Sequence, residues 1–113
     1  MWARVGIVRS GEKLEQALDE IGSLQGRAEK MNTAGGRAFN LTWQQALDMR
    51  NMLIASELIA RSALLREESR GAHYREDFID MDNTNGLKNI YLARNGTELK
   101  FWTKPVKLTR LLA

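Results

Sequence analysis

The sequence predicts a mainly α-helical fold, a three-helix bundle (spectrin-repeat-like) with a small carboxy-terminal β-hairpin. Apolar residues recur every three or four positions in two long stretches, which is the spacing of one helix face. Two strand-like runs near the carboxyl end flank Asn95-Gly96, the preferred type I′ hairpin turn. The 113 residues have room for one domain. We therefore expect a single domain over 1–113, with the bundle at about 1–78 and the hairpin and tail at about 87–113.

The first two helices are predicted from their end signals. The chain opens on a short apolar group that should be the last turn of a helix, with Gly6 as its stop; the group consists of Trp2, Val5, Ile7 and Val8. A buried Trp2 would mean either that the helical pattern begins before residue 1 or that this turn folds onto the core. A second helix should start after Ser10, a good N-cap residue, with Glu12 in its first turn, where a negative charge suits the helix dipole. One apolar face follows: Leu14, Ala17, Ile21, Leu24, Ala28 and Met31.

Two glycines, Gly22 and Gly26, interrupt the second helix, and each costs about 1 kcal/mol relative to alanine in a helix interior. We expect either that another backbone segment passes close to them or that the helix frays after Leu24. Residues 32–40 have the composition of a loop. Its paired glycines are not followed by the Lys and the Ser or Thr of a phosphate-binding loop, which excludes that motif.

The third helix is predicted to be the longest. Thr42 and Gln45 form a capping-box pattern, so the helix should begin at Trp43 and continue to about Glu68, with Gly71 as its stop. Its apolar residues cover two overlapping faces, which indicates burial against two partners. They are Leu47, Met49, Leu53, Ile54, Leu58, Ala60, Leu64 and Leu65.

The carboxy-terminal hairpin is predicted from Ile90–Arg94 and Thr97–Thr103, which should pair across Asn95-Gly96. Pro105 should end the second strand, and Val106–Leu112 should follow as an extended or loosely helical tail. Because an isolated hairpin is marginally stable in water, this one must pack on the helices or on another chain.

Composition excludes several kinds of function. The absence of cysteine excludes disulfides, thiolate nucleophiles and thiolate metal sites, and it favours a cytoplasmic location. No apolar run is long enough to span a bilayer, so we expect no direct membrane contact. The excess positive charge lies after residue 79, among strand-like residues rather than on one helix face, so we expect no nucleic-acid partner. Its cations are Lys88, Arg94, Lys100, Lys104, Lys107 and Arg110.

A cluster of charge surrounds His73, the only histidine. Histidine titrates near neutrality and arginines bind carboxylates, so the cluster could be an acid/base site. A helix carboxyl end also needs donors for its last carbonyls, and the pattern alone favours this structural interpretation over catalysis. One histidine without cysteine makes a metal site a poorer interpretation still. The other members are Arg66, Glu67, Glu68, Arg70, Arg75, Glu76 and Asp77.

The run LLREESRGAHYREDF at residues 64–78 resembles a carboxy-terminal motif of the succinate dehydrogenase/fumarate reductase flavoprotein family. That family also includes L-aspartate oxidase and the adenylylsulfate reductase flavoprotein. The likeness covers nearly the whole chain. It departs from the family at Ile79, where proline is common, and at Gly86, where the succinate dehydrogenase branch often has tryptophan. Outside residues 64–78 the likeness to the family is carried by Met1-Trp2, Val5 to Arg9, Leu47 to Arg50, Glu57-Leu58, Arg61 and Lys104-Pro105-Val106.

The resemblance implies a helical module that is a fragment of a larger flavoprotein and packs against its FAD-binding domain. The family's FAD fingerprint and its dicarboxylate-binding residues lie upstream of this region, so this chain should hold no cofactor and be inactive alone. Contact with an iron–sulfur subunit, and association with the inner face of the membrane through partner subunits, are further implications. The residues expected at the domain interface are Arg66, Arg70, His73, Arg75 and Asp77.

Three alternatives stay open on the sequence. The chain could be the carboxy-terminal domain of an L-aspartate oxidase, although the hairpin and Lys104-Pro105-Val106 favour the succinate dehydrogenase/fumarate reductase branch. It could be a free-standing module that binds a protein or forms homodimers through the wide apolar surface of the third helix. It could be a small acid/base enzyme that uses His73.

Overall fold

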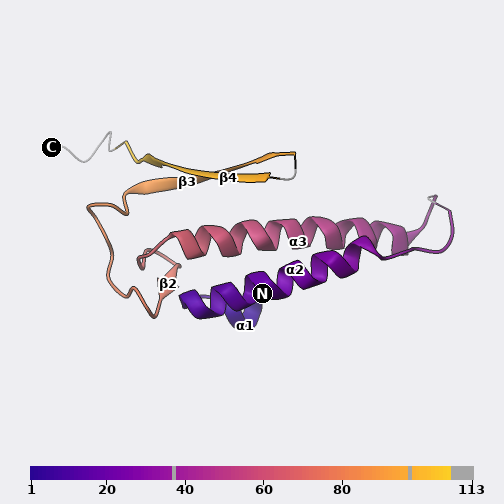
Figure 1. Ribbon diagram of the computed structural model, residues 1–113, viewed down its shortest axis with the longest axis horizontal. Helices are drawn as coiled ribbons and strands as arrows, with labels where there is room; N and C mark the ends of the chain where they lie inside the picture. Colours follow the sequence, from indigo (N-terminus) through magenta and orange to yellow (C-terminus); the bar gives the residue numbers. More distant parts are fainter. Residues whose placement is uncertain (37, 97, 108–113) are drawn as a thin grey trace.

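The computed structural model describes residues 1–36, 38–96 and 98–107 (Figure 1). Helices α2 (Gly11–Glu29) and α3 (Leu41–Leu65) form a long antiparallel pair, and α1 (Trp2–Val5) packs on α2. Strands β3 (Lys88–Asn95) and β4 (Glu98–Pro105) form a hairpin along the other side of α3. The predicted class is confirmed, although α1 is a single turn and the bundle is chiefly the α2–α3 pair.

The start of each long helix is set by a side-chain cap. Ser10 Oγ accepts from the Lys13 amide at 3.3 Å, as predicted. For α3 the predicted cap is wrong, because Asn40 Oδ1 accepts from the Trp43 amide at 3.0 Å and the helix begins at Leu41. The Asn40 side chain also donates to the Ala34 and Gly36 carbonyls, so the residue that fixes the preceding loop also caps the helix.

The two interior glycines of α2 do not behave as predicted. The helix is continuous to Glu29, so it does not fray after Leu24. A Cβ placed on Gly22 or Gly26 would meet no atom within 4 Å, so no backbone segment passes close to either. Met31 lies beyond the helix and is exposed. The glycines therefore weaken α2 without a packing role.

The core lies where α1, α2 and the second half of α3 meet. Leu14, Ala17 and Ile21 of α2 pack against Ala60 and Ala63 of α3, with Val5 of α1 beside them. The small alanines let the two long helices approach closely. Trp2 is not part of this core, since it is 88% exposed. Among the described residues, the predicted burial of α3 against two partners is only partial, because α2 covers one side and open clefts separate the hairpin from the other. The exposed apolar residues of α3 are Leu41, Leu47, Met49, Met52, Ile59 and Leu65.

Two small sheets complete the fold. Strands β1 (Val8–Arg9) and β2 (Tyr74–Arg75) are parallel, so residues near the amino terminus lie beside residues that follow α3. In the hairpin Asn95 pairs with Glu98, so Asn95 belongs to the strand rather than to the turn. Gly96 has a positive φ of 64°, as a tight turn requires. Strand β4 ends at Pro105 as predicted, whereas the predicted tail beyond residue 107 lies outside the described residues.

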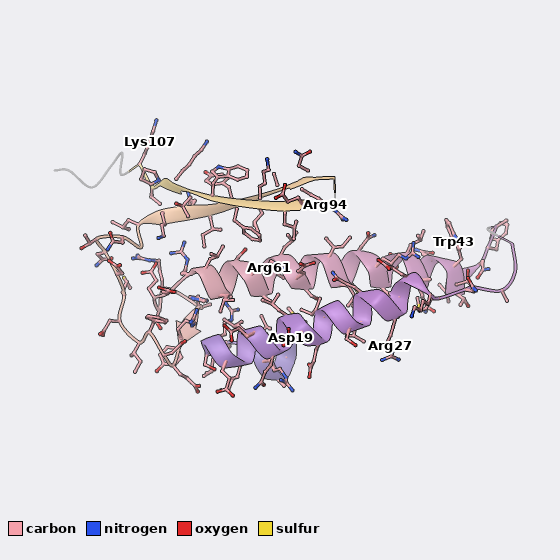
Figure 2. The ribbon with its side chains drawn as sticks, viewed as in Figure 1. Asp19, Arg27, Trp43, Arg61, Arg94 and Lys107 are labelled. Atoms are coloured by element: carbon pink, nitrogen blue, oxygen red, sulfur yellow. The ribbon has the colours of Figure 1, made fainter. Side chains whose placement is uncertain are left out.

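The hairpin is only loosely seated on the helices. Its inner residues Ile90 and Leu92 face Leu58 and Ile59 of α3 across an open cleft of about 430 Å³. A second cleft, of about 530 Å³, separates Leu99 from α2 and α3. Figure 2 shows side chains projecting from both faces of the hairpin. Among the described residues, no helix is long and apolar enough to cross a membrane.

Candidate interface at the end of α3

The five residues predicted to form an interface lie together where α3 ends. They belong to residues 66–87, here called the end loop, which contains only the short strand β2 and folds back across the end of the bundle. Arg9 of β1 and Glu68 join the same network. The helix ends at Leu65 rather than near Glu68 as predicted, and the network explains why.

Arg75 is the buried centre of the network, with a side chain that is 2% exposed. Its Nη1 donates to the carbonyls of Ala63, Leu64 and Arg66 at 3.0, 3.2 and 3.3 Å. These are the carbonyls that lose their helical donors when α3 stops. The helix can therefore end at Leu65, because a side chain from the following loop supplies the missing donors.

Asp77 joins Arg75 to the second helix. Its two carboxylate oxygens accept from Arg75 Nε and Nη2, both at 2.6 Å, and Oδ2 also accepts from the Gly11 amide at 2.8 Å. The Arg75 hydrogen bonds, helped by the Gly11 amide and opposed by burial, hold the pKa of Asp77 far below its usual range. This pair thus links the end of α3 to the start of α2.

Glu68 is equally buried, at 2% exposed. It accepts from Arg70 Nε and Nη2 at 3.2 and 3.1 Å, from the Asp82 amide at 2.9 Å, and from Arg66 Nη1. Burial alone would raise the pKa of Glu68, but these hydrogen bonds bring it below its usual value. The sequence placed Glu68 on the last turn of α3. The alternation Arg66-x-Glu68-x-Arg70 could have indicated an extended segment with one charged side.

Arg66 and Arg70 also hold the far side of the end loop. Arg66 donates to the Gly86 and Lys88 carbonyls at 3.0 and 2.6 Å, and Arg70 donates to the Asp82 carbonyl at 3.0 Å. Glu68, Arg66, Arg70 and the Asp82 carbonyl form a cage around Gly86, which is buried. A Cβ on Gly86 would collide with the Asp82 carbonyl and the Glu68 carboxylate. The cage leaves no room for a side chain at residue 86, which accounts for glycine at this position.

Gly71 is a turn residue and not the stop of α3 as predicted. It lies within a tight turn closed by reciprocal amide–carbonyl bonds between Arg70 and His73 at 2.8 and 3.0 Å. Its φ of 58° is in the left-handed region that glycine adopts without strain. The turn places the His73 ring against the end of α3.

His73 has a partner that sequence reasoning missed. Arg9 Nη1 lies 2.8 Å from Nδ1, and the Arg66 carbonyl lies 3.1 Å from Nε2. A guanidinium can only donate, so Nδ1 is the acceptor and the proton is assigned to Nε2. Burial, followed by the nearby cations of Arg9, Arg75 and Arg66, lowers the pKa of His73. Both ring nitrogens are occupied within the protein, so the geometry favours the structural interpretation over acid/base catalysis.

The surface over this network carries exposed apolar side chains among acidic ones. Four large side chains of the end loop project outward, and together they form what we call the end face. The described residues contain no group of three His, Asp or Glu side chains placed to hold a metal ion. The arrangement suits contact with another protein surface rather than chemistry. The end face consists of Tyr74, Phe78, Ile79 and Met81.

Comparison with known proteins identifies relatives over the whole chain. Residues 1–113 match a family described as fumarate reductase flavoprotein C-term. A fumarate reductase (CoM/CoB) subunit of Methanothermobacter marburgensis is 47% identical over 78 residues, which are 69% of this chain and 14% of that protein. Chloroplastic L-aspartate oxidase of Oryza sativa is 32% identical over 107 residues, or 95% of this chain and 17% of that protein.

The fold also matches solved structures. A mutant of the E. coli quinol fumarate reductase superposes with a TM-score of 0.91 at 30% identity, covering 98% of this chain and 20% of that chain. This chain therefore spans no more than about a fifth of the length of these relatives.

Proposed function

Because the chain belongs to the family of fumarate reductase flavoprotein carboxy-terminal domains, we propose that it serves as this domain in an FAD-dependent enzyme that interconverts succinate and fumarate. The observation that carries the proposal is the match of fold over 98% of the chain to a quinol fumarate reductase. The other four-fifths of such an enzyme would supply the flavin site and the dicarboxylate site.

The described residues do not fit FAD. A dinucleotide site places the pyrophosphate at a helix amino terminus that follows a strand. The junction between β1 and α2 is the one described place with that order, and the Asp77 carboxylate already accepts from its first amide, Gly11. A phosphate would meet a negative charge there. We therefore derive no redox step within this chain.

We further propose that the end face packs against the FAD-binding domain of the same flavoprotein. Arg75 is too buried to touch a neighbour, so its part is to fix the shape of the end loop from within, together with Arg66 and His73. Arg70 and Asp77 reach the surface, with side chains 28% and 36% exposed. They would contribute a polar rim around the apolar end face, as in ordinary protein interfaces.

The enzymatic proposal is tested by comparing the flavoprotein that contains this chain with the 113-residue chain alone. The whole flavoprotein should show flavin absorbance, reduce fumarate with reduced benzyl viologen and oxidise succinate, and the chain alone should do none of these. Oxidation of L-aspartate in preference to succinate would assign the chain to the aspartate oxidase branch instead. A yellow, active preparation of the chain alone would refute the proposal.

The interface proposal is tested with a matched pair of substitutions. Met81→Glu introduces a charge into the end face, where Met81 is 53% exposed. The control, Met52→Glu, introduces the same charge on α3, where Met52 is 67% exposed. Titration of the chain with the separately expressed remainder of the flavoprotein should give a dissociation constant at least about tenfold weaker for Met81→Glu only. Equal losses, or no loss at Met81, would exclude the end face as the docking surface.

A further inference from the structure

The hairpin has an outer face that the helices do not use. Its register places four residue pairs on the side opposite Ile90, Leu92, Leu99 and Phe101. This outer face looks away from α3, because Ile90 and Leu92 on the opposite face line the cleft toward α3. From the open end to the turn, the pairs are Asn89–Lys104, Tyr91–Trp102, Ala93–Lys100 and Asn95–Glu98.

The centre of the outer face is an exposed aromatic pair. The Tyr91 and Trp102 rings are stacked, with centroids 5.7 Å apart and planes at 14°. The ammonium of Lys104 lies 5.4 Å from the Tyr91 ring centroid. The two aromatic residues are nevertheless 39% and 41% exposed. Large aromatic side chains held in one orientation and open to solvent are typical anchors of protein interfaces.

The charge around this pair has one sign. Lys100 and Lys104 stand on either side of Trp102 along β4, and neither takes part in a salt bridge among the described residues. The one acid of the outer face, Glu98, is at the turn. Lys100 and Lys104 are four residues apart, so their stems are about 13 Å from one another along an extended strand.

We propose that the outer face binds an extended acidic segment of a partner protein. Two carboxylates of that segment, themselves about four residues apart, would pair with Lys100 and Lys104. An apolar side chain between them would rest on Trp102, which lies between the two lysines on β4. The inference does not depend on the enzymatic proposal, because it rests on the hairpin alone.

The geometry favours a polypeptide over other anionic partners. Trp102 and Lys104 both lie against the Tyr91 ring, so this ring is not open for stacking a nucleobase, and single-stranded nucleic acids use successive stacking positions. The outer face also has no aliphatic side chain larger than Ala93 that could enter a lipid layer.

The test uses the 113-residue chain and a short fluorescein-labelled peptide in which a central leucine lies two residues from a glutamate on each side. Binding is followed by fluorescence anisotropy at low and at physiological salt. Lys100→Gln and Lys104→Gln should each raise the dissociation constant about two- to fivefold, and Trp102→Val about tenfold or more. Valine keeps the strand propensity, and the two lysine variants test the proposal even where Trp102→Val disturbs the hairpin.

Arg27→Gln is the matched control, because it removes one positive charge from exposed α2 and the Arg27 side chain points away from the hairpin (Figure 2). It should leave the dissociation constant unchanged. The proposal is overturned by a lack of saturable binding, by an equal loss in Arg27→Gln, or by equal affinity for the peptide with glutamines in place of its glutamates. Tighter binding of oligothymidylate or of phosphatidylglycerol vesicles would also overturn it.

Discussion

The end loop and the hairpin hold their shapes in opposite ways. The end loop has almost no regular secondary structure, yet its buried polar groups are paired, and its side chains reach α2, α3 and β1. The hairpin has a complete ladder of eight residue pairs, yet clefts separate it from the helices. Secondary structure therefore does not indicate which part of this molecule is held firmly against the helices. Buried side chains that form hydrogen bonds to several elements indicate it instead.

Removal of Arg75 should have the largest effect. Arg75→Ala leaves the Ala63 and Leu64 carbonyls without this donor and Asp77 without its cation, and the Arg66 carbonyl keeps only His73. Unfolding should therefore need about 3–5 kcal/mol less free energy. Urea denaturation followed by circular dichroism measures this loss. The control is Arg61→Ala, which breaks an exposed helical pair with Glu57 and should cost about 0.5 kcal/mol or less. Similar losses in the two variants would contradict the central role of Arg75.

Neutralising Glu68 should come next. Glu68→Gln leaves Arg66 and Arg70 in the cage without their anion, and the free energy of unfolding should fall by about 2 kcal/mol. Glu67→Gln, at the exposed neighbouring residue, should change it by less than about 0.5 kcal/mol. The same urea titrations compare the two. A Glu68→Gln protein as stable as the parent would show that the cage does not need its charge.

The hairpin should respond less to the same kind of change. Leu14 is completely buried in the core, so Leu14→Ala should cost about 2–5 kcal/mol. Leu92 faces an open cleft, and Leu92→Ala should cost only about 1 kcal/mol. Thermal denaturation of both variants measures the difference. Equal costs would mean that the hairpin closes onto α3 more tightly than its clefts indicate.

The smallest expected effect is a pH dependence near neutrality that comes from His73 in the end loop. The pKa of His73 is below the 6.5 of the unfolded chain, so the unfolded state binds more protons as the pH falls. The free energy of unfolding should therefore be highest above pH 6.5 and decrease below it. His73→Gln should flatten this part of the curve, since the chain has no other histidine. The losses from Glu68 and Asp77 should begin only below their ordinary pKa values of 4.5 and 3.8. An unchanged slope in His73→Gln would exclude this residue as the cause.

Sequence patterns correctly predicted the features that depend on neighbouring residues alone. The spacing of Leu14, Ala17 and Ile21 identified the core face of α2, and Ser10 identified its start. Pro105 identified the end of β4 because proline cannot donate to a ladder. The motif resemblance also led us to expect five interface residues in the end loop; the structure brings their side chains together, and their role at an interface stays a prediction.

The remaining features depend on contacts between distant residues. The end of α3 could not be placed because its last carbonyls are satisfied by Arg75, about ten positions along the chain. The Asn40 cap depends on bonds to the preceding loop. Trp2 was interpreted as buried because it is apolar, but it lies on the surface. The spacing of apolar residues shows which of them share a face, and it does not show whether another element covers that face.

The pairing of β1 with β2 has a consequence for the order of folding. Its bonds join residues more than sixty positions apart, as those from Arg9 to His73 and from Gly11 to Asp77 do. Closing so long a loop in an unfolded chain costs entropy before any contact compensates for it. Once α2 and α3 have paired as a helical hairpin, the same residues are already near each other and the effective loop is short. The end loop, the most firmly bonded part of the finished protein, should therefore be among the last parts to form.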